Sequence, residues 1–408
     1  MSPTSASLKS PALRWFAIIA AGFFLVIIVN QYFFCPQYNF PEPHPFSGSL
    51  IYNPYQNMDS SQWRKCNFHA HTRAWYGATT GKGNEEKLWS TYDSLGYAVH
   101  CISNYEQVNR YHDTAHNYIA AYEHGYGLMK NHHLLLNTHH VIWGDYYFPQ
   151  TLSNKQNVLE CLSVNDTQLL SINHPLLSHG FAPDNMRYLS GYDCMEVLRD
   201  DNTYSFLNWD AALESGKPIF IVADDDVHHI EDPFEVGRNC TWVNATTPKA
   251  RNIIHALKTG DAYGMIIGYT RGETMNQKLA KVKAGLPMLR AIHLNGDTIR
   301  VRVSRPASQI NFFGEKLQQI GMILSSSEGM YVMKPGDPYV RTEIVFDDGT
   351  RIFLNPFFRY DGKFPEQKIP PVDESKTVFF RIIGGLILLA FVIVIVIRAR
   401  RRRGVASL

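Results

Sequence analysis

Two stretches of the chain have almost no polar positions, and each is long enough to cross a membrane. Residues 15–34 carry no charge, and residues 378–397 are nearly continuous isoleucine, leucine, valine and phenylalanine, interrupted by Arg381. About twenty apolar residues in a helix span the roughly 30 Å core of a bilayer. The pattern predicts a transmembrane helix near each end. For the first we favour an uncleaved signal anchor over a signal peptide, because no small-residue cleavage site follows it.

The charges beside these two stretches predict their orientation. Lys9 and Arg14 precede the first stretch, and a run of arginines in residues 398–403 follows the second. Since lysine and arginine are in excess on the cytoplasmic side of membrane proteins, both termini are expected in the cytoplasm. Residues 36–376 would then lie on the other side, in a periplasmic or other extracytoplasmic space.

In residues 61–270, short apolar runs alternate with longer stretches that have helical periodicity. The strand candidates are residues 65–68, 98–102, 133–136, 169–172, 194–197 and 219–222. The helix candidates include residues 84–95, 155–162, 209–214 and 248–258. Strands that alternate with helices predict an α/β domain with a parallel βα architecture. Its functional residues are expected at the carboxyl ends of the strands.

The pattern changes in residues 287–360, which we expect to form a small antiparallel β domain. Its strand candidates are residues 289–294, 298–304, 309–313, 339–346 and 350–354. The sequence Asp347-Asp348-Gly349 between the last two is a hairpin signal. A linker rich in proline and lysine, residues 363–376, then leads to the second membrane helix.

Composition narrows the possible functions. The chain has 39 Lys and Arg against 37 Asp and Glu, a formal net charge of +2, which excludes a strongly cationic nucleic-acid-binding protein. The 17 histidines exceed what packing or charge requires, and most of them lie between His69 and His229. The 6 cysteines include no CxxC pair, so a zinc knuckle and a thioredoxin-type motif are both excluded. The histidine cluster therefore directs attention to a metal site.

Two pairs of candidate metal ligands follow predicted strands. His69 and His71 form an HxH motif, and Asp226 and His228 form a DxH motif. Side chains two residues apart on an extended segment point the same way, so each pair can bind one ion. Imidazole together with carboxylate suits zinc, manganese or iron. The three consecutive aspartates 224–226 follow an apolar strand, and their charges are costly unless a cation or partial protonation compensates them.

Further candidates lie between these two motifs. Glu123 stands in a Tyr-Glu-His-Gly sequence, His132 and His133 precede a run of leucines, and His174 follows another apolar strand. A carboxylate such as Glu123 can bridge two cations in a multinuclear site. His174 occupies the same kind of position at a strand end as the paired motifs do.

In their order along the chain, these motifs resemble those of the polymerase and histidinol phosphatase (PHP) superfamily. The resemblance extends over residues 65–268. It implies a distorted barrel of seven βα units, two or three Mn, Zn or Fe ions, and hydrolysis of phosphate esters.

The resemblance also implies two sets of metal ligands that share Glu123. The first set is His69, His71, Glu123 and Asp226. The second set is Glu123, His174 and either His132 or His133, between which the spacing does not decide. His228 would serve a third ion or the substrate phosphate. Glu123, as the bridge, and His228, as a carrier of protons, are the expected catalytic residues, and no organic cofactor is expected.

The sequence departs from the PHP pattern where members usually have Asp-His after the second strand. This chain has Ser103-Asn104-Tyr105 there, and neither Asn nor Tyr replaces a histidine ligand well. Two functions therefore stay open. One is a membrane-anchored, extracytoplasmic metal-dependent phosphoesterase that uses a metal-activated water on a small-molecule or envelope phosphomonoester or phosphodiester. The other is a catalytically degenerate PHP-like sensor or scaffold that binds a metal or ligand. The intact HxH, DxH, Glu123 and His174 favour the enzyme.

Overall fold

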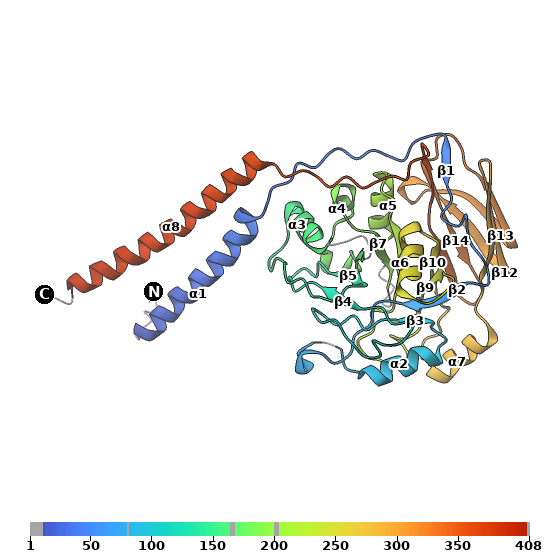
Figure 1. The fold of residues 1–408 in the computed structure, drawn as a ribbon, viewed down its shortest axis with the longest axis horizontal. Helices are drawn as coiled ribbons and strands as arrows, with labels where there is room; N and C mark the ends of the chain where they lie inside the picture. Colours follow the sequence, from blue (N-terminus) through green and yellow to red (C-terminus); the bar gives the residue numbers. More distant parts are fainter. Residues whose placement is uncertain (1–10, 80, 164–167, 200–203, 406–408) are drawn as a thin grey trace, which may run out of the picture. The chain divides into compact units, whose positions relative to one another are not determined.

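The computed structural model describes residues 11–79, 81–163, 168–199 and 204–405. It divides into two compact units. Unit 1 comprises Met1–Phe40, Tyr146–Val158 and Pro370–Leu408, and unit 2 comprises Pro41–Asp145 and Leu159–Ile369. Figure 1 labels the helices and strands along the chain.

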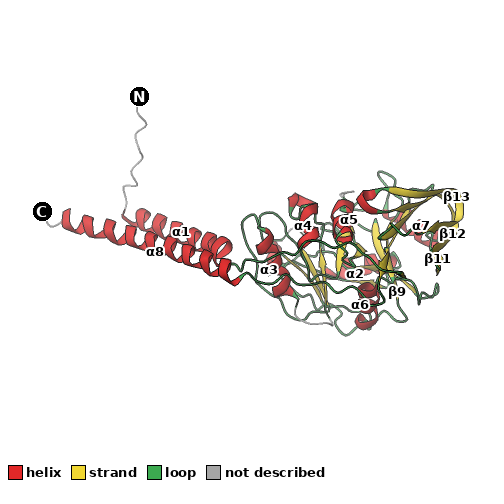
Figure 2. Cartoon of the chain, turned by 90° about the horizontal axis from the view of Figure 1, so that it is seen from above, coloured by secondary structure: helices red, strands yellow, loops and turns green. Residues whose placement is uncertain are grey.

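Unit 1 is built around two long apolar helices that lie side by side (Figures 1 and 2). Helix α1 (Pro11–Val29) continues into a π-helical turn, Asn30–Phe34, and helix α8 spans Glu374–Val405. The segments Ala12–Phe34 and Glu374–Arg400 are each long and apolar enough to cross a membrane. The orientation of the chain in a membrane stays a prediction.

Specific contacts join the ends of these helices. A Cβ atom on Gly384 would lie only 2.8 Å from Cβ of Phe33, so the two backbones approach closely at a position without a side chain. Arg381 Nε donates a hydrogen bond to the carbonyl oxygen of Phe34 at 3.3 Å. The buried Gln31 side chain donates to the carbonyl oxygen of Phe148 and accepts from its N–H, both at 2.9 Å. The segment around Phe148 is thereby attached to the end of α1.

Unit 2 contains two β-sheets. The smaller one has five strands in the order β4-β5-β6-β7-β8, and all of their residues are buried. The strands are β4 (Ala121–His124), β5 (His133–Leu136), β6 (Leu169–Ile172), β7 (Cys194–Leu198) and β8 (Phe220–Ala223). Strands β6, β7 and β8 are parallel, whereas β5 is antiparallel to both β4 and β6.

The larger sheet has eleven strands and crosses the boundary expected near residue 287. Its main path is β1-β16-β14-β15-β10-β9-β2-β3, and β12 joins β11 and β13 to it through β14. The strands are β1 (Leu50–Tyr52), β2 (Trp63–Asn67), β3 (Val99–His100), β9 (Asn239–Asn244), β10 (Ala262–Ile266), β11 (Leu289–Asn295), β12 (Thr298–Phe313), β13 (Gln319–Val332), β14 (Tyr339–Val345), β15 (Arg351–Leu354) and β16 (Phe357–Tyr360). Strand β10, which precedes that boundary, pairs with β15, which follows it. A separate β domain at residues 287–360 stays a prediction.

The shorter helices begin and end where the local sequence favours it. The helices outside the two long apolar ones are α2 (Glu85–Ser94), α3 (Leu152–Leu162), α4 (Pro183–Tyr188), α5 (Phe206–Glu214), α6 (Ala250–Thr259) and α7 (Met275–Ala284). Asn84 precedes α2, and its side chain accepts a hydrogen bond from the N–H of Lys87 at 2.8 Å. Gly260 ends α6 with φ +79°, a conformation that glycine adopts without steric cost.

The structure is a mixed α/β fold, as the hydrophobic pattern predicts, but its strands are not all parallel. Strands β5 and β6 have the predicted bounds. Strand β4 was not predicted, and it is antiparallel to β5 because residues 125–132 join them without a helix, too short a link for a parallel crossover. The predicted strands 298–304 and 309–313 form the single strand β12, with a register shift after Arg302. A closed barrel of seven βα units stays a prediction.

Candidate metal centre

The HxH and DxH motifs are brought together by the backbone. Ala70 and Val227 form a parallel β-bridge, in which the N–H of His71 donates to the carbonyl oxygen of Val227 at 2.8 Å. The N–H of Asp226 donates to the carbonyl oxygen of His69 at 3.0 Å. Residues on either side of a bridge position point to the same face of an extended pair. His69 and His71 therefore face the same space as the DxH side chains.

Glu123, on β4, places one carboxylate oxygen in each of two groups of imidazole nitrogens. Its Oε2 lies 3.2 Å from His69 Nε2 and 3.1 Å from His71 Nε2. Its Oε1 lies 3.0 Å from His132 Nδ1 and 3.1 Å from His174 Nε2. All five side chains are buried. A carboxylate in this position can bridge two cations.

Asp226 completes the first group. Its Oδ1 lies 3.1 Å from His69 Nε2, 3.3 Å from His71 Nε2 and 3.4 Å from His228 Nε2. Its Oδ2 accepts a hydrogen bond from Arg199 Nε at 2.8 Å. Asp226 and His174 have φ angles of +49° and +25°. A positive φ costs a residue other than glycine roughly 1–3 kcal/mol, and residues strained in this way are concentrated at functional sites.

The arrangement of these atoms fits a divalent cation. Five distances among His69 Nε2, His71 Nε2, Glu123 Oε2 and Asp226 Oδ1 are 3.1–3.3 Å, including 3.1 Å between the two imidazole nitrogens. Two ligand atoms each about 2.1 Å from one ion, and 90–109° apart, lie roughly 3.0–3.4 Å from each other. Glu123 Oε2, Asp226 Oδ1, His132 Nδ1 and His174 Nδ1 are buried without a hydrogen-bond partner among the described residues. Buried polar atoms normally have partners, and a cation would provide one for the two carboxylate oxygens.

Ionisation in the site shows how the buried charges compensate each other. Burial lowers the pKa of His69, but Asp226, Glu123 and Glu196 outweigh it and raise the pKa well above its ordinary value. Burial raises the pKa of Glu123, but His69 and His132 hold it well below its ordinary value. The carboxylates are therefore charged, and a proton on His69 compensates part of their charge. A bound cation would take the place of that proton.

The structure places His132, rather than His133, beside Glu123. The His133 ring packs against the rings of His124 and Phe181, with centroids 5.9 and 5.6 Å away. Neighbouring residues on an extended chain point to opposite sides, so only one of the two histidines can face Glu123. The assignment of the individual residues as metal ligands stays a prediction.

Only one of the three consecutive aspartates faces this site. Asp225 accepts hydrogen bonds from the N–H groups of residues 237–239 and from the Tyr92 hydroxyl, at 2.6–2.9 Å. Asp224 accepts from the N–H of Phe68 at 2.6 Å, and burial followed by the charge of Glu196 raises its pKa well above its ordinary value. Of the two compensations expected for the three aspartates, a cation or partial protonation, the raised pKa of Asp224 fits protonation, whereas Asp225 is satisfied by hydrogen-bond donors.

The Ser103-Asn104-Tyr105 segment also lies at the site. Asn104 accepts a hydrogen bond from the N–H of Thr72 at 2.8 Å, and this bond attaches the segment to the HxH motif. The Tyr105 ring stacks on His71 at 4.6 Å and lies 5.3 Å from the ring of His132. Burial raises the pKa of Tyr105, so its phenol is protonated at neutral pH. A neutral aromatic ring thus occupies a position where the PHP pattern has a histidine.

Three functional candidates were missed by the sequence analysis. Glu196, on β7, accepts a hydrogen bond from His69 Nδ1 at 3.0 Å and from the N–H of His174 at 2.8 Å. Asn173 donates to Glu123 Oε1 at 3.2 Å, and Arg199 contacts Asp226 as described above. Two of these residues have a signal in the sequence. Glu196 is a charged residue inside the apolar run of residues 194–198, and Arg199 directly follows the end of that run.

Two solved structures are similar to this chain. One is the crystal structure of a two-domain protein containing a predicted PHP-like metal-dependent phosphoesterase from Bacteroides vulgatus. It is 12% identical, covers 80% of this chain and 93% of that chain, and has a TM-score of 0.39. The other is PsfC from Pseudomonas syringae, which is 11% identical, covers 54% of this chain and 95% of that chain, and has a TM-score of 0.35.

No protein-family model matches the chain, and no curated protein matches it significantly. Because both TM-scores are low, the function proposed below is based on the arrangement of the side chains.

Proposed function

We propose that the chain is a metal-dependent phosphoesterase of the PHP type that acts on a phosphomonoester or phosphodiester outside the cytoplasm. The observation that carries this proposal is the position of Glu123. Its two oxygens lie 3.0–3.2 Å from two separate pairs of imidazole nitrogens, those of His69 and His71 and those of His132 and His174. A buried carboxylate shared between two such groups is the arrangement of a binuclear hydrolase site.

The side chains form two groups of ligands, and each group would hold one ion. Mn²⁺, Zn²⁺ and Fe²⁺ are the candidates. The first ion would be held by His69, His71, Glu123 and Asp226. The second would be held by Glu123, His132 and His174. When bound, such ions lower the pKa of a water molecule and neutralise charge on phosphate oxygens.

The remaining polar residues would orient the substrate. His228 is the most exposed histidine of the group, with 19% of its side chain accessible, so a substrate can reach it. Burial lowers the pKa of His228 to about 4, so its ring is neutral at pH 7 and its ring N–H can donate a hydrogen bond to a substrate oxygen. Arg199, held by Asp226, brings a guanidinium group suited to a phosphate oxygen.

Hydrolysis assays on the full chain in detergent test this proposal. We expect turnover of p-nitrophenyl phosphate or bis-p-nitrophenyl phosphate that depends on added Mn²⁺ or Zn²⁺. Asp226→Asn should lower kcat/KM on the order of 100-fold or more, because it removes charge from the first ligand group. The exposed His293 provides a matched control, and His293→Gln should retain activity. Equal activity of the wild-type protein and Asp226→Asn would refute the proposal.

The alternative, a sensor or scaffold that binds metal without turnover, is favoured by one observation. Tyr105, which stands where the PHP pattern has a metal ligand, stacks on His71 and has its ring 5.3 Å from that of His132. If the wild-type protein binds metal tightly but hydrolyses neither substrate, this second function is supported instead.

The extracytoplasmic placement of unit 2 is part of the proposal and has its own test. It is supported by the two apolar helices and by the arginine run at residues 398–403. Cys161 is exposed and the other cysteines are buried. A membrane-impermeant maleimide should therefore label Cys161 in sealed right-side-out vesicles, and Cys161→Ser should abolish the label. Labelling only after the vesicles are permeabilised would place unit 2 in the cytoplasm.

A further inference from the structure

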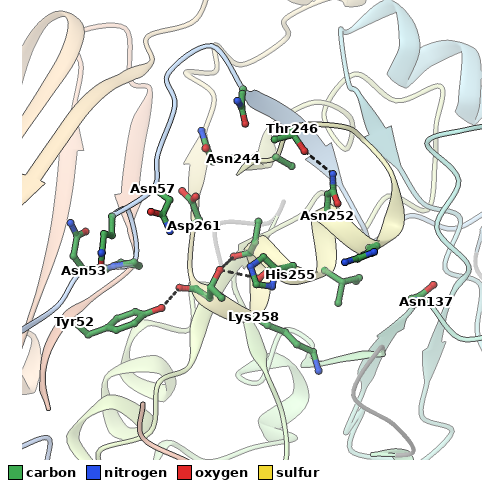
Figure 3. Close-up of a pocket in the computed structure, with 18 residues that line it drawn as sticks. Tyr52, Asn53, Asn57, Asn137, Asn244, Thr246, Asn252, His255, Lys258 and Asp261 are labelled. Carbon is green, nitrogen blue, oxygen red and sulfur yellow. Dashed lines mark hydrogen bonds between the residues drawn. The ribbon is translucent and has the colours of Figure 1, made fainter. Parts of the chain in front are cut away.

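A cleft of about 880 Å³ that is lined mostly by polar residues lies in unit 2 (Figure 3). Strand β2 separates it from the metal centre, because Gln62 lines the cleft just before the strand and His69 follows the strand. At about 3.3 Å per residue, this separation is roughly 20 Å. The cleft has no residue in common with the metal centre, and its volume is within the range of roughly 300–1,000 Å³ that is usual for ligand sites.

Carboxamide side chains dominate the lining of the cleft. Seven of the 18 lining residues are asparagine or glutamine, and Gln56 and Asn57 among them are exposed. Several of these groups are bound within the protein: Asn53 accepts from the N–H of Tyr55, Asn244 pairs with the backbone of Asp59, and Asn252 donates to Thr246 and Thr247. The exposed carboxamides of Gln56 and Asn57 can offer an N–H donor and a carbonyl acceptor side by side, which match neighbouring hydroxyl groups that both donate and accept. This composition suits a ligand with many hydroxyl groups.

Helix α6 contributes a basic wall to the cleft. Arg251, His255 and Lys258 are four and seven residues apart, so they share one face of the helix over roughly 10 Å. Figure 3 shows His255 and Lys258 on this helix, with Asn53 and Asn57 on the segment across the cleft. Lys258 is also paired with Asp193 at 3.3 Å. The exposed Arg251 is therefore the better placed cation for an acidic group of a ligand.

Other ligand classes fit the lining less well. The aromatic residue of the cleft, Tyr52, stacks on Phe358 at 4.7 Å and donates its hydroxyl to the carbonyl oxygen of Thr259 at 2.9 Å. It therefore makes a poor platform for stacking a nucleobase, the usual basis for binding single-stranded nucleic acid. The large aliphatic residue in the lining, Ile254, is buried, whereas the anchor residues of a peptide need pockets formed by several such side chains.

The site is longer than a single cleft. Lys258 also lines a second cleft, of about 550 Å³, so the two adjoin at this side chain. The second cleft contributes further polar groups, among them Gln168, Asp193 and Gln367. An elongated polar site of this kind accommodates several linked units rather than one.

We propose that this cleft binds an acidic oligosaccharide. The exposed Gln56 and Asn57 hold its hydroxyl groups, and Arg251 holds its carboxylate or phosphate group. The binding is independent of the metal centre and would tether the protein to a glycan whether or not it is a phosphoesterase.

Binding of defined glycans to the full chain in detergent tests the proposal. The probes are acidic oligosaccharides that carry uronate, sialate or phosphate groups, with maltotetraose as a neutral probe, and affinity is measured by calorimetry. We expect at least one acidic probe to bind more tightly than maltotetraose. Arg251→Ala should weaken that binding at least tenfold, and Asn57→Ala should weaken it as well. Arg300→Ala, which removes an exposed arginine on β12, is the matched control and should leave the affinity unchanged.

Three results would overturn the proposal: no acidic probe binds, binding is insensitive to both cleft substitutions, or only a nucleic acid or peptide binds. Asp226→Asn separates this site from the metal centre. It should leave glycan affinity unchanged even where it abolishes hydrolysis.

Discussion

The carboxylate of Glu196 accepts a hydrogen bond from His69 Nδ1 at 3.0 Å, and this bond points His69 Nε2 toward Glu123 and Asp226. A carboxylate that holds the far nitrogen of a ligand histidine fixes both its tautomer and its orientation. Glu196 also accepts the N–H of His174, so one side chain positions residues of both ligand groups.

Removal of the Glu196 charge should therefore weaken metal binding without changing a ligand. We expect Glu196→Gln to lower the affinity for Mn²⁺ or Zn²⁺ by roughly 10- to 100-fold. Competition with a chromogenic chelator measures this change. Glu328→Gln, at an exposed position on β13, is the control and should bind metal normally. An unchanged affinity in Glu196→Gln would show that the hydrogen bond does not orient His69.

His132 and His133 should differ in their effect on metal content, because only His132 lies beside Glu123. We expect His132→Ala to lose one equivalent of metal in elemental analysis. His133→Ala should retain the metal but unfold more easily, by about 1–3 kcal/mol, because its ring packs against His124 and Phe181. Loss of metal in His133→Ala alone would reverse the assignment.

Asp261 should make the protein less stable as the pH rises. Burial raises its pKa from 3.8 to about 7, so the folded state holds the proton over a range in which the unfolded chain has released it. The free energy of unfolding then falls between about pH 4 and pH 7, by at most on the order of 4 kcal/mol, and this cost persists above pH 7. Asp261→Asn should raise Tm at pH 8 and have a smaller effect at pH 4. An equal effect at both pH values would contradict the assigned ionisation.

Gly384 and Gly385 provide a matched pair for the contact between α1 and α8. A side chain on Gly384 would collide with Phe33 and Phe34, whereas a Cβ on Gly385 meets no atom within 4 Å. Gly384→Val should therefore separate the helices, and Gly385→Val should not. The yield of a disulfide between Phe33→Cys and Phe380→Cys reports the separation, since these rings lie 6.2 Å apart. Equal yields in the two glycine variants would show that the helices do not pack through Gly384.

The sequence predicts those parts of the site that depend on local geometry. Two-residue spacing places His69 with His71 and Asp226 with His228, and apolar runs predict strands such as β5 and β6. The bridge between Ala70 and Val227, which brings the two motifs together, joins residues far apart in the chain and leaves no local signal. Glu196 was missed for a related reason, because its role depends on β7 lying between β6 and β8.

Local patterns also fail where a backbone group replaces an expected partner. The three aspartates 224–226 look alike in the sequence, but Asp225 is satisfied by the N–H groups of residues 237–239. The pairing of His132 with Glu123 likewise follows from the antiparallel register of β4 and β5, in which His124 lies opposite His133. That register is a property of the strand pair, and the alternation of helices and strands does not reveal it.

The metal content of the wild-type protein and of Glu123→Gln tests the central claim most directly. Native mass spectrometry and elemental analysis of the full chain should find two divalent ions per wild-type chain. Because the carboxylate oxygens of Glu123 serve both ligand groups, Glu123→Gln should lower occupancy of both sites and abolish hydrolysis. A wild-type protein without bound metal, or a Glu123→Gln protein that retains two ions and full activity, would contradict it.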